Sequence, residues 1–247
     1  MQLWICPLIA FLLGSVPFGL IIAKLKDIDI RAHGSGNIGA TNVLRVVGKK
    51  YGITCLILDA FKGLIPTMIG LSLIRFAGPD GQPHDNPMAI EALTSYATVL
   101  PAAAQWKAQA CQVLTGLFAI LGHNYSPWVG FKGGKGIATS AGVLIALMPA
   151  AVVLLIIVWL IAFFTTRYVA IASIAAAAAL PILTVYGAWF HGKFANGTWN
   201  KPLLAFTILI SILAIWKHRS NIERLRAGTE HRFERKGKKA TLVNKPN

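Results

Sequence analysis

The sequence is poor in charge, and poorest in acidic residues. Asp, Glu, Lys and Arg make up 13% of its 247 residues, about half of their share in soluble domains. With 55% hydrophobic residues, the composition excludes an ordinary soluble domain and predicts a polytopic membrane protein with one membrane domain. Only 9 acidic residues oppose 24 Lys and Arg, which gives a net charge of +15. In so apolar a chain this excess favours a membrane surface, and no nucleic acid, as the partner.

Cysteine is also scarce. Cys6, Cys55 and Cys111 all lie in apolar runs. Their odd number argues against a disulfide framework and for buried, inert thiols. Nothing in the sequence pairs them into a metal site, so neither a metal nor a cofactor is expected. The first apolar run has no Lys or Arg before it and no small-residue cleavage site after it, which predicts a retained transmembrane helix rather than a signal peptide.

Six apolar runs are separated by polar or basic segments. In chain order they cover residues 3–23, 52–76, 108–121, 137–165, 168–190 and 202–216. Pro17 and Gly19 predict a kink near the end of the first run. The loop from Gly78 to about Lys107 contains an amphiphilic piece around 89–104, which is expected to lie on the membrane surface.

The run at 137–165 decides the predicted topology. It is long for one helix and short for two, because about 20 apolar residues cross a bilayer. Two half-length helices hinged near Pro149 place the basic segments 24–51 and 122–136, together with the C-terminal tail, in the cytoplasm, in accord with the positive-inside tendency. The prediction is an all-α fold of seven transmembrane helices, with the N-terminus outside and the C-terminus inside.

The segment GFKGGKGIATS, residues 130–140, combines glycine with lysine beside a long apolar run. Glycine lets the backbone approach a ligand, and Lys132 and Lys135 supply charge for an anion. Residues 137–139 have the character of a first helical turn, whose free N–H groups form an anion site. The segment therefore predicts a phosphate cradle; the alternative is a flexible basic loop that only marks the cytoplasmic side. It is not a Walker A loop, since no Ser or Thr follows Lys135.

Residues 31–45, RAHGSGNIGATNVLR, form another polar cluster. They contain a literal G-x-G-x-x-G, but no βαβ unit surrounds it, so a dinucleotide fingerprint is a weak interpretation. The glycines still free backbone N–H groups, and Arg45 can hold a phosphate through two parallel hydrogen bonds. Four side chains add hydroxyl or amide groups: Ser35, Asn37, Thr41 and Asn42. The alternative is a turn followed by a helix cap.

Asp59 and Lys62 stand three residues apart inside an apolar run. A charge in a membrane span costs about 2.5–3.5 kcal/mol, so the pair needs a reason. It is either a neutralising ion pair or an anion site in which Lys62 binds and Asp59 orients. His123, which has no acidic residue at a suitable spacing to orient it, is interpreted as a hydrogen-bond donor or a structural cap.

The segment 216–230 follows the last apolar run. Three of its polar residues are spaced by three and share one helix face: His218, Asn221 and Arg224. The alternative is a basic helix lying on anionic lipid. If the clusters converge, their cations exceed the nearby carboxylates and suit two phosphate groups: Arg45, Lys62, Lys132 and Lys135.

Five segments occur in this order: GSVPFG (14–19), GSGNIGATNVLR (34–45), LDAFKGLIP (58–66), GHNYSPWVGFKGGKGIATSAG (122–142) and HRSNIERLRAGTE (218–230). Together they resemble the motifs of the bacterial acyl-phosphate:glycerol-3-phosphate acyltransferases, membrane enzymes of phospholipid synthesis. The resemblance implies a seven-helix protein of the bacterial inner membrane whose active site opens to the cytoplasm. The implied reaction moves a fatty acyl group from acyl phosphate to the 1-hydroxyl of glycerol 3-phosphate, giving 1-acyl-glycerol 3-phosphate (lysophosphatidic acid) and phosphate.

The resemblance also implies roles for individual residues. Acyl phosphate is already activated, so the protein needs no covalent nucleophile and acts by positioning and charge stabilisation. The catalytic set is Ser35, Arg45 and Lys135, with no side chain as general base, because the leaving phosphate takes the hydroxyl proton. The substrate-binding set is Asn37, Thr41, Asn42, Lys62, Gly63, His123, Lys132, Gly133, Gly134, Ser140, His218, Asn221 and Arg224. Acyl phosphate, glycerol 3-phosphate and membrane lipid are the implied partners of a monomer.

Two features refine the resemblance. Acyltransferases that use acyl thioesters carry H-x-x-x-x-D, whereas His123 is followed at that distance by Trp128, which disfavours a thioester donor. The loop at 77–107 is longer than the family needs. Residues 1–230 are predicted to form the single transmembrane domain, and 231–247 a basic cytoplasmic tail without a fold.

Two other classes of protein are weaker alternatives. A permease for a phosphorylated anion would carry ionisable groups near the bilayer midplane and internal symmetry, and no repeat is visible in the sequence. A scaffold that recruits anionic lipid through its basic tail leaves the glycine-rich clusters unexplained.

Overall fold

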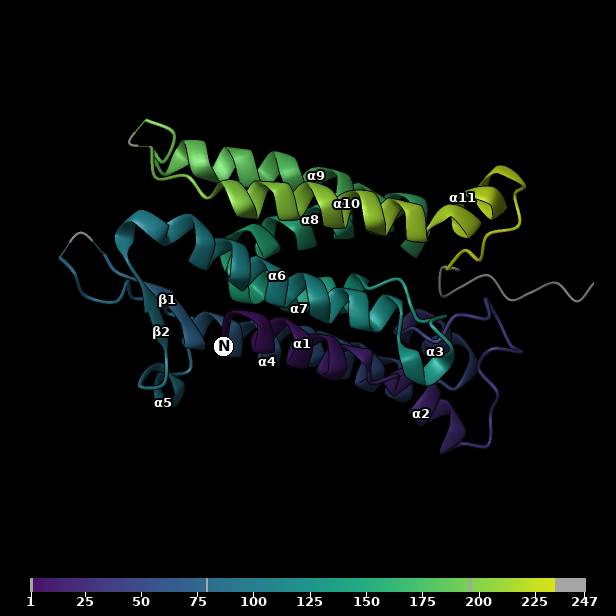
Figure 1. Ribbon diagram of the computed structural model, residues 1–247. Helices are drawn as coiled ribbons and strands as arrows, with labels where there is room; N and C mark the ends of the chain where they lie inside the picture. Colours follow the sequence, from purple (N-terminus) through teal and green to yellow (C-terminus); the bar gives the residue numbers. More distant parts are fainter. Residues whose placement is uncertain (1, 79, 196, 234–247) are drawn as a thin grey trace, which may run out of the picture.

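The apolar runs fold into helices that lie side by side along a common axis (Figure 1). The structure, a computed structural model, describes residues 2–78, 80–195 and 197–233. The bundle is made of α1 (Gln2–Ser15), α2 (Phe18–Lys24), α4 (Lys49–Leu73), α6 (Gln105–Asn124), α7 (Ile137–Leu147), α8 (Pro149–Thr166), α9 (Val169–Phe190) and α10 (Lys201–Lys217). The shorter helical elements are α3 (Ala40–Val46), α5 (Glu91–Thr94), η1 (Ala102–Ala104), η2 (Pro127–Val129) and α11 (Arg219–Arg226).

Several of these helices suit a lipid bilayer. In the described part of the chain, 4 helical segments are long and apolar enough to cross a membrane, or up to 5 if α10 and α11, bent by 48°, count as one span. Large apolar side chains such as Leu12, Ile57 and Ile161 remain exposed, as lipid-facing positions would. The prediction of a mostly helical membrane protein is therefore confirmed, and the count of seven spans stays a prediction.

The first span breaks at Pro17, as predicted, because proline has no N–H to continue the helical hydrogen bonds. Side chains from elsewhere satisfy two carbonyls at the break. Ser126 Oγ donates to the Ser15 carbonyl at 2.6 Å. Lys62 Nζ donates to the Val16 carbonyl at 2.7 Å. The break between α1 and α2 is thereby tied to α4 and to the segment after α6.

Two polar segments hold more structure than predicted. The loop expected at 24–51 contains α3, and α4 begins within it at Lys49. Between α4 and α6, β1 (Ile74–Phe76) and β2 (Thr98–Leu100) pair in parallel, with their first residues opposite each other. The all-α class is wrong to this extent, since the β-branched and aromatic residues of β1 end α4 early and join a ladder. The piece at 89–104 contains α5, β2 and η1, and its place on the membrane surface stays a prediction.

The run at 137–165 divides at Pro149, as predicted. α7 has 11 residues and is a half-length helix, but α8 has 18 and is long enough to cross a bilayer alone. The prediction of two half-length helices is therefore wrong for α8. Proline starts a helix readily at its first position, so the boundary falls just before Pro149 and leaves the larger share of the run to α8.

α7 packs against α4 through direct backbone contacts. A Cβ on Gly63 would lie 2.2 Å from the carbonyl oxygen of Thr139, and a Cβ on Gly142 would lie 1.9 Å from that of Ala60. Only glycine permits this approach, so each helix contributes one where the other comes closest. The contact supplies protein surroundings for a helix too short to face lipid on its own.

The two ends of the bundle differ in charge. One end, which we call the basic end, holds α2, α3, α11 and the segment 125–136 (Figure 1). The opposite end holds β1, β2 and the α9–α10 connection. Among the described residues, the Lys and Arg at that opposite end are Arg75, Lys107, Lys193 and Lys201.

Candidate active site

A cavity of about 370 Å³ lies at the basic end of the bundle. It brings together many of the predicted site residues: Ser35, Asn37, Thr41, Asn42, Arg45, His123, Lys135, His218 and Asn221. These residues come from three clusters that are far apart in the sequence. The convergence supposed from the sequence is therefore observed for residues 31–45, 122–140 and 216–230.

Another part of the cavity lining, which we call the apolar wall, carries no charge. It is formed by Leu56, Ile137, Ala138, Ala141, Ile156, Trp159, Val169 and Ala170. α7, α8 and α9 supply most of these side chains. The cavity thus joins a polar, cationic side to a lipid-like side, which suits a ligand with a charged head and an apolar body.

Polar contacts from the C-terminal helix hold Lys135. Its Nζ donates to Asn221 Oδ1. Asn221 Nδ2 donates to Glu230 Oε1 at 2.8 Å, and Arg224 Nε donates to Glu230 Oε2 at 2.7 Å. The charges of Glu230 and Arg224 also act on the guanidinium of Arg45. The carboxylate of Glu230 is therefore outnumbered by three nearby cationic side chains, which leaves an excess of positive charge around it.

Burial and the neighbouring positive charges lower the pKa values of Lys135 and Arg45. Burial, helped by the charges of Arg224 and Arg45 and opposed by Glu230, lowers the pKa of Lys135 to about 8. Burial also lowers the pKa of Arg45, with Glu230 again opposing, although a guanidinium stays charged at neutral pH. A bound anion would relieve this repulsion, so the electrostatics favour phosphate or another anion beside Lys135 and Arg45.

Asn42 shapes the glycine-rich segment before α3. Its Nδ2 donates to the carbonyls of Ile30, His33 and Asn37, at 3.2, 3.1 and 2.9 Å. Its Oδ1 accepts the N–H of Ser35 at 2.9 Å. The amide of Asn42 is thus occupied by the backbone of this segment. In the structure, Asn42 therefore stabilises the backbone of the segment that places Ser35 and Asn37 in the cavity lining.

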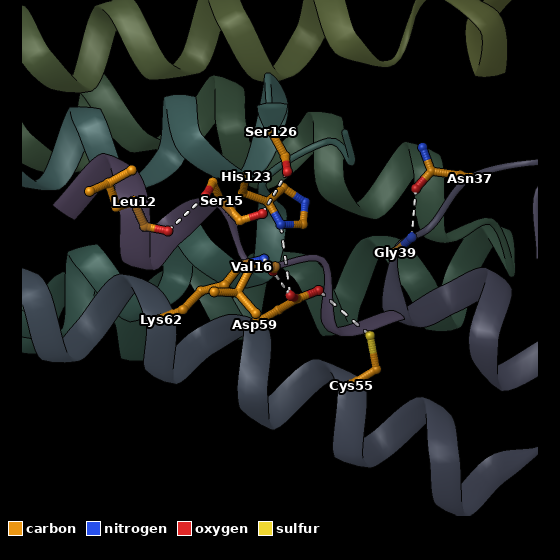
Figure 2. A network of polar contacts seen from close by, with 10 residues as sticks. All are labelled: Leu12, Ser15, Val16, Asn37, Gly39, Cys55, Asp59, Lys62, His123 and Ser126. Atoms are coloured by element: carbon orange, nitrogen blue, oxygen red, sulfur yellow. Dashed lines mark hydrogen bonds and ion pairs between the residues drawn. The ribbon is translucent and has the colours of Figure 1, made fainter. Parts of the chain in front are cut away.

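A buried group surrounds Asp59 (Figure 2). Lys62 Nζ lies 2.8 Å from Asp59 Oδ1, and His123 Nδ1 lies 3.7 Å from the same oxygen. Cys55 Sγ donates to Asp59 Oδ2 at 3.6 Å. Asp59 and His123 line the cavity, whereas Lys62 points to the break in the first span and does not. This geometry fits the interpretation of Asp59 and Lys62 as a neutralising pair.

The glycine-rich segment 130–136 folds over His123. The N–H of Gly134 donates to the His123 carbonyl at 3.1 Å, and a Cβ on Gly134 would lie 2.1 Å from His123 Nε2. Gly136, at φ +81°, precedes Ile137, the first residue of α7. His123 therefore supports the segment that carries Lys135, which fits its interpretation as a structural cap.

The remaining predicted residues lie outside the cavity: Lys62, Gly63, Lys132, Gly133, Gly134, Ser140 and Arg224. Gly63 is occupied by the contact between α4 and α7, and the side chain of Lys132 is exposed. Ser140 lines a neighbouring apolar cavity. Arg224 donates to Glu230, which lines the cavity.

The sequence interpretation left out several cavity-lining residues, above all Glu230, Trp159 and Ser173. Glu230 had a signal, because acidic residues are rare in this chain and it ends one of the recognised motifs. Trp159 Nε1 donates to Ser173 Oγ at 3.3 Å across two apolar helices. This contact could not be predicted, because a single polar group in an apolar run does not show which helix carries its partner.

Within residues 2–78, 80–195 and 197–233, no group of three or more His, Cys, Asp or Glu side chains is placed to hold a metal ion. The chemistry available from the described residues is the binding and stabilisation of negative charge by Lys135, Arg45 and their neighbours.

The fold and the site together define a helical integral membrane protein whose cavity at one end is lined by Lys135 and Arg45 on one part and by apolar side chains on another. The family model for glycerol-3-phosphate acyltransferase matches residues 4–228, and the chain belongs to this family. A glycerol-3-phosphate acyltransferase of Geobacter sulfurreducens is 39% identical over 227 residues, covering 92% of this chain and 95% of that relative. The corresponding protein of Aquifex aeolicus is 40% identical over 224 residues, with 91% and 95% covered.

Solved structures agree with this assignment. The crystal structure of PlsY (YgiH), an integral membrane glycerol 3-phosphate acyltransferase, in its glycerol 3-phosphate form, superposes with a TM-score of 0.70 at 38% identity. The match covers 95% of this chain and 96% of that one. Its lysophosphatidic acid form superposes with a TM-score of 0.68. The predicted membership of an acyltransferase family of phospholipid synthesis is confirmed.

Proposed function

We propose that this chain is an acyl-phosphate:glycerol-3-phosphate O-acyltransferase. It moves a fatty acyl group from acyl phosphate to the 1-hydroxyl of sn-glycerol 3-phosphate, giving 1-acyl-glycerol 3-phosphate and inorganic phosphate. This is the first acylation of phospholipid synthesis. Family membership supports glycerol 3-phosphate as the acceptor. The choice of donor rests on the character of the site.

One observation carries the proposal: Lys135 and Arg45 line the same cavity as an apolar wall from α7, α8 and α9. Two phosphates meeting in one site need more cationic than anionic side chains. Asp59 and Glu230 line the cavity, but each is paired with a cation beside it, Lys62 and Arg224, which leaves Lys135 and Arg45 in excess. The apolar wall gives a place for the donor's fatty chain. A site of this kind works by proximity and charge stabilisation, which suffices for an activated acyl group.

The catalytic set remains Ser35, Arg45 and Lys135. The hydroxyl oxygen of glycerol 3-phosphate attacks the acyl carbonyl carbon, the bond from that carbon to the phosphate oxygen breaks, and the hydroxyl proton passes to the leaving phosphate. Lys135 and Arg45 stabilise the charge on the phosphates. Ser35, whose backbone N–H donates to Asn42 Oδ1, contributes its hydroxyl as a donor.

His218 is suited to orient the attacking hydroxyl. Its Nδ1 lies 2.7 Å from the Ala214 carbonyl, and a carbonyl only accepts hydrogen bonds, so Nδ1 carries the hydrogen. In the neutral ring Nε2 therefore keeps its lone pair. Since His218 lines the cavity, this nitrogen can accept the hydroxyl hydrogen bond of the acceptor.

The same proposal covers the arrangement in the membrane. Residues 1–230 form one domain with seven spans, in which α6 and the short α7 complete the set of apolar helices. The basic end, with the cavity, faces the cytoplasm of a bacterial inner membrane, and the enzyme works as a monomer. The tail at 231–247 falls mostly outside the described residues, and only its first residues through Phe233 are within them.

The test is an assay of purified protein with palmitoyl phosphate and glycerol 3-phosphate. The expected result is release of phosphate in step with formation of lysophosphatidic acid, without added metal. Parallel reactions receive palmitoyl-CoA or palmitoyl acyl carrier protein in place of palmitoyl phosphate. Activity only with these thioesters would overturn the donor assignment while keeping the family.

A further inference from the structure

A second, smaller cavity adjoins the apolar wall of the first. Its volume is about 130 Å³. The two cavities share Ile137, Ala141, Ile156, Trp159 and Ser173. From this shared wall the second cavity extends between α7, α8, α9 and α10 to three buried side chains, which we call the floor: Leu144, Val152 and Leu180.

We propose that the second cavity holds the distal part of the donor's acyl chain and that the floor sets which chain lengths are accepted. This inference rests on the proposed function, because it takes the charged cavity as the place of the acyl phosphate head. Because the two cavities share lining residues, the occupant we propose for the second cavity is an acyl chain whose head lies in the first, beside Lys135 and Arg45. Small side chains on α9, Ala176 and Ala177, leave the space open.

The dimensions suit a membrane fatty acid. Val169 lines the first cavity, Leu180 closes the second, and both belong to α9. Their separation corresponds to about 16 Å along the helix axis, at about 1.5 Å per residue. The hydrocarbon core of a bilayer is about 30 Å thick, so one acyl chain of a leaflet spans about half of that. The path from the charged head to the floor thus has the length of one such chain.

The cavity is closed at the floor and open at its side. Leu144, Val152 and Leu180 belong to the buried hydrophobic core, whereas Ile156 on the rim is 52% exposed. A chain can therefore enter from surrounding lipid beside Ile156. Lipid is as apolar as the cavity, so burial by itself gives little preference between chains. Selection by length must come from steric fit against the floor.

A third cavity lies beyond the floor. It has a volume of about 260 Å³ and is lined by Leu147, Met148, Leu183 and Thr184 among others. These residues follow Leu144 and Leu180 by about one helical turn on α7 and α9. Shortening a floor side chain would therefore open a way for longer chains toward this space.

The experiment compares acyl phosphates of increasing length in the full-length enzyme. Decanoyl, palmitoyl and stearoyl phosphate are tested with wild type, Ala177→Leu, which fills the cavity, and Leu180→Ala, which lowers the floor. Ala178→Leu is the matched control, because Ala178 is the next residue on α9 but is exposed. The readout is kcat/KM for each donor.

Ala177→Leu is expected to lower the palmitoyl-to-decanoyl ratio by about tenfold, the scale of inserting methylenes into a close-packed apolar space. Leu180→Ala is expected to raise the stearoyl-to-palmitoyl ratio. The control should keep both ratios within about twofold of wild type, as exposed substitutions usually do.

The proposal is overturned if folded Ala177→Leu keeps the wild-type ratios, or if Ala178→Leu shifts them as much. Should Leu180→Ala fail to fold, Ala177→Leu decides alone. A wild type inactive with every acyl phosphate overturns the proposed donor instead. In that case the same series of acyl thioesters decides about the cavity: shifted ratios in Ala177→Leu support it, and unshifted ratios overturn it.

Discussion

Lys132 and Lys135 belong to the same glycine-rich segment, yet only Lys135 lines the cavity and contacts Asn221. Lys135→Ala is expected to lower turnover with acyl phosphate by about 10²-fold or more, the scale of losing one charge-stabilising donor. Lys132→Ala removes the same charge from an exposed position and should cost only a few-fold in turnover, since its interaction is screened by water. Steady-state kinetics of both variants make the comparison. Equal losses would return the whole segment to the role of a basic loop.

The proton on Lys135 should appear in the pH profile. Its pKa is lowered to about 8, so the free enzyme loses this positive charge as pH rises through that value. Because the proposed role needs the protonated form, kcat/KM should fall on the alkaline side with a midpoint near pH 8. Glu230 raises this pKa, and Glu230→Gln should therefore move the midpoint to lower pH.

Two variants separate this effect from structural damage. Lys135→Arg should retain some activity and lose the alkaline limb near pH 8, because a guanidinium does not deprotonate there. Glu230→Asp should restore a midpoint close to wild type if the carboxylate acts through its charge. An unchanged midpoint in Glu230→Gln would exclude this coupling.

A substitution of Lys62 tests whether this charged residue in an apolar run stabilises the fold or binds substrate. Its ammonium is held by Asp59 and the Val16 carbonyl, away from the cavity. Lys62→Met would leave Asp59 buried without its partner, which typically costs about 3–5 kcal/mol. We expect a marked fall in the thermal unfolding temperature, and recovery of most of it in the double variant Asp59→Asn/Lys62→Met.

A different result is expected if Lys62 binds substrate. If it bound the phosphate of glycerol 3-phosphate, Lys62→Met would raise the KM for this substrate while the unfolding temperature stayed near wild type. The double variant would then remain as defective in KM as the single one.

Residue types were easier to predict than residue roles. Arg45 and Lys135 were expected at an anion site because both lie in polar, glycine-rich segments, and both line the cavity. Lys62 carries the same charge, but the contact that occupies it comes from the break in the first span, far away in sequence. Gly63 could equally approach a ligand or a helix. Only the position of Thr139 decides between the two.

At the level of elements, the contact between α4 and α7 has the clearest consequence. A Cβ on Gly63 would lie 2.2 Å from a backbone oxygen of α7, so Gly63→Ala must push the helices apart. A loss of about 1–3 kcal/mol is expected, as for other overpacked sites. Gly187→Ala on α9 is the control, because nothing lies within 4 Å of its Cβ. It should be neutral or stabilising by up to about 1 kcal/mol.

Thermal unfolding of the two glycine variants gives the comparison. Activity should fall in Gly63→Ala together with stability, because α7 begins at the segment that carries Lys135. Full stability with lost activity would instead make Gly63 part of the substrate site.

Helix boundaries followed local chemistry wherever a proline set them. Pro17 and Pro149 both mark breaks that the sequence predicted, since a missing N–H acts within one turn. The strands β1 and β2 were not predicted, because each has only three residues and depends on a partner more than twenty residues away. The length of α8 was misjudged although its end was not: the apolar run ends at 165 and α8 at Thr166, but the division just before Pro149 leaves 18 residues to α8.

At the scale of the whole molecule, charge and apolarity are arranged along one axis. The cavity lies at the basic end, while its apolar wall runs into the lipid-facing seam of α7, α8 and α9. A substrate with a charged head and a fatty chain can therefore place its head among the cationic side chains at the basic end and its chain beside the lipid. This joint placement was predictable because basic loops gather on one side of a membrane. The exact partners within the cavity were not, since they depend on how three distant segments pack.

The orientation of this axis in the membrane is the last prediction. The described Lys and Arg residues at the end opposite the cavity are few, so the positive-inside tendency places the basic end in the cytoplasm. In a variant without its three cysteines, single cysteines at Lys132 and Lys193 report the two ends, and both positions are exposed. A membrane-impermeant maleimide should label Lys193→Cys in intact cells and Lys132→Cys only after permeabilisation. Labelling of Lys132→Cys in intact cells would invert the topology and put the cavity outside, where cytoplasmic glycerol 3-phosphate could not reach it.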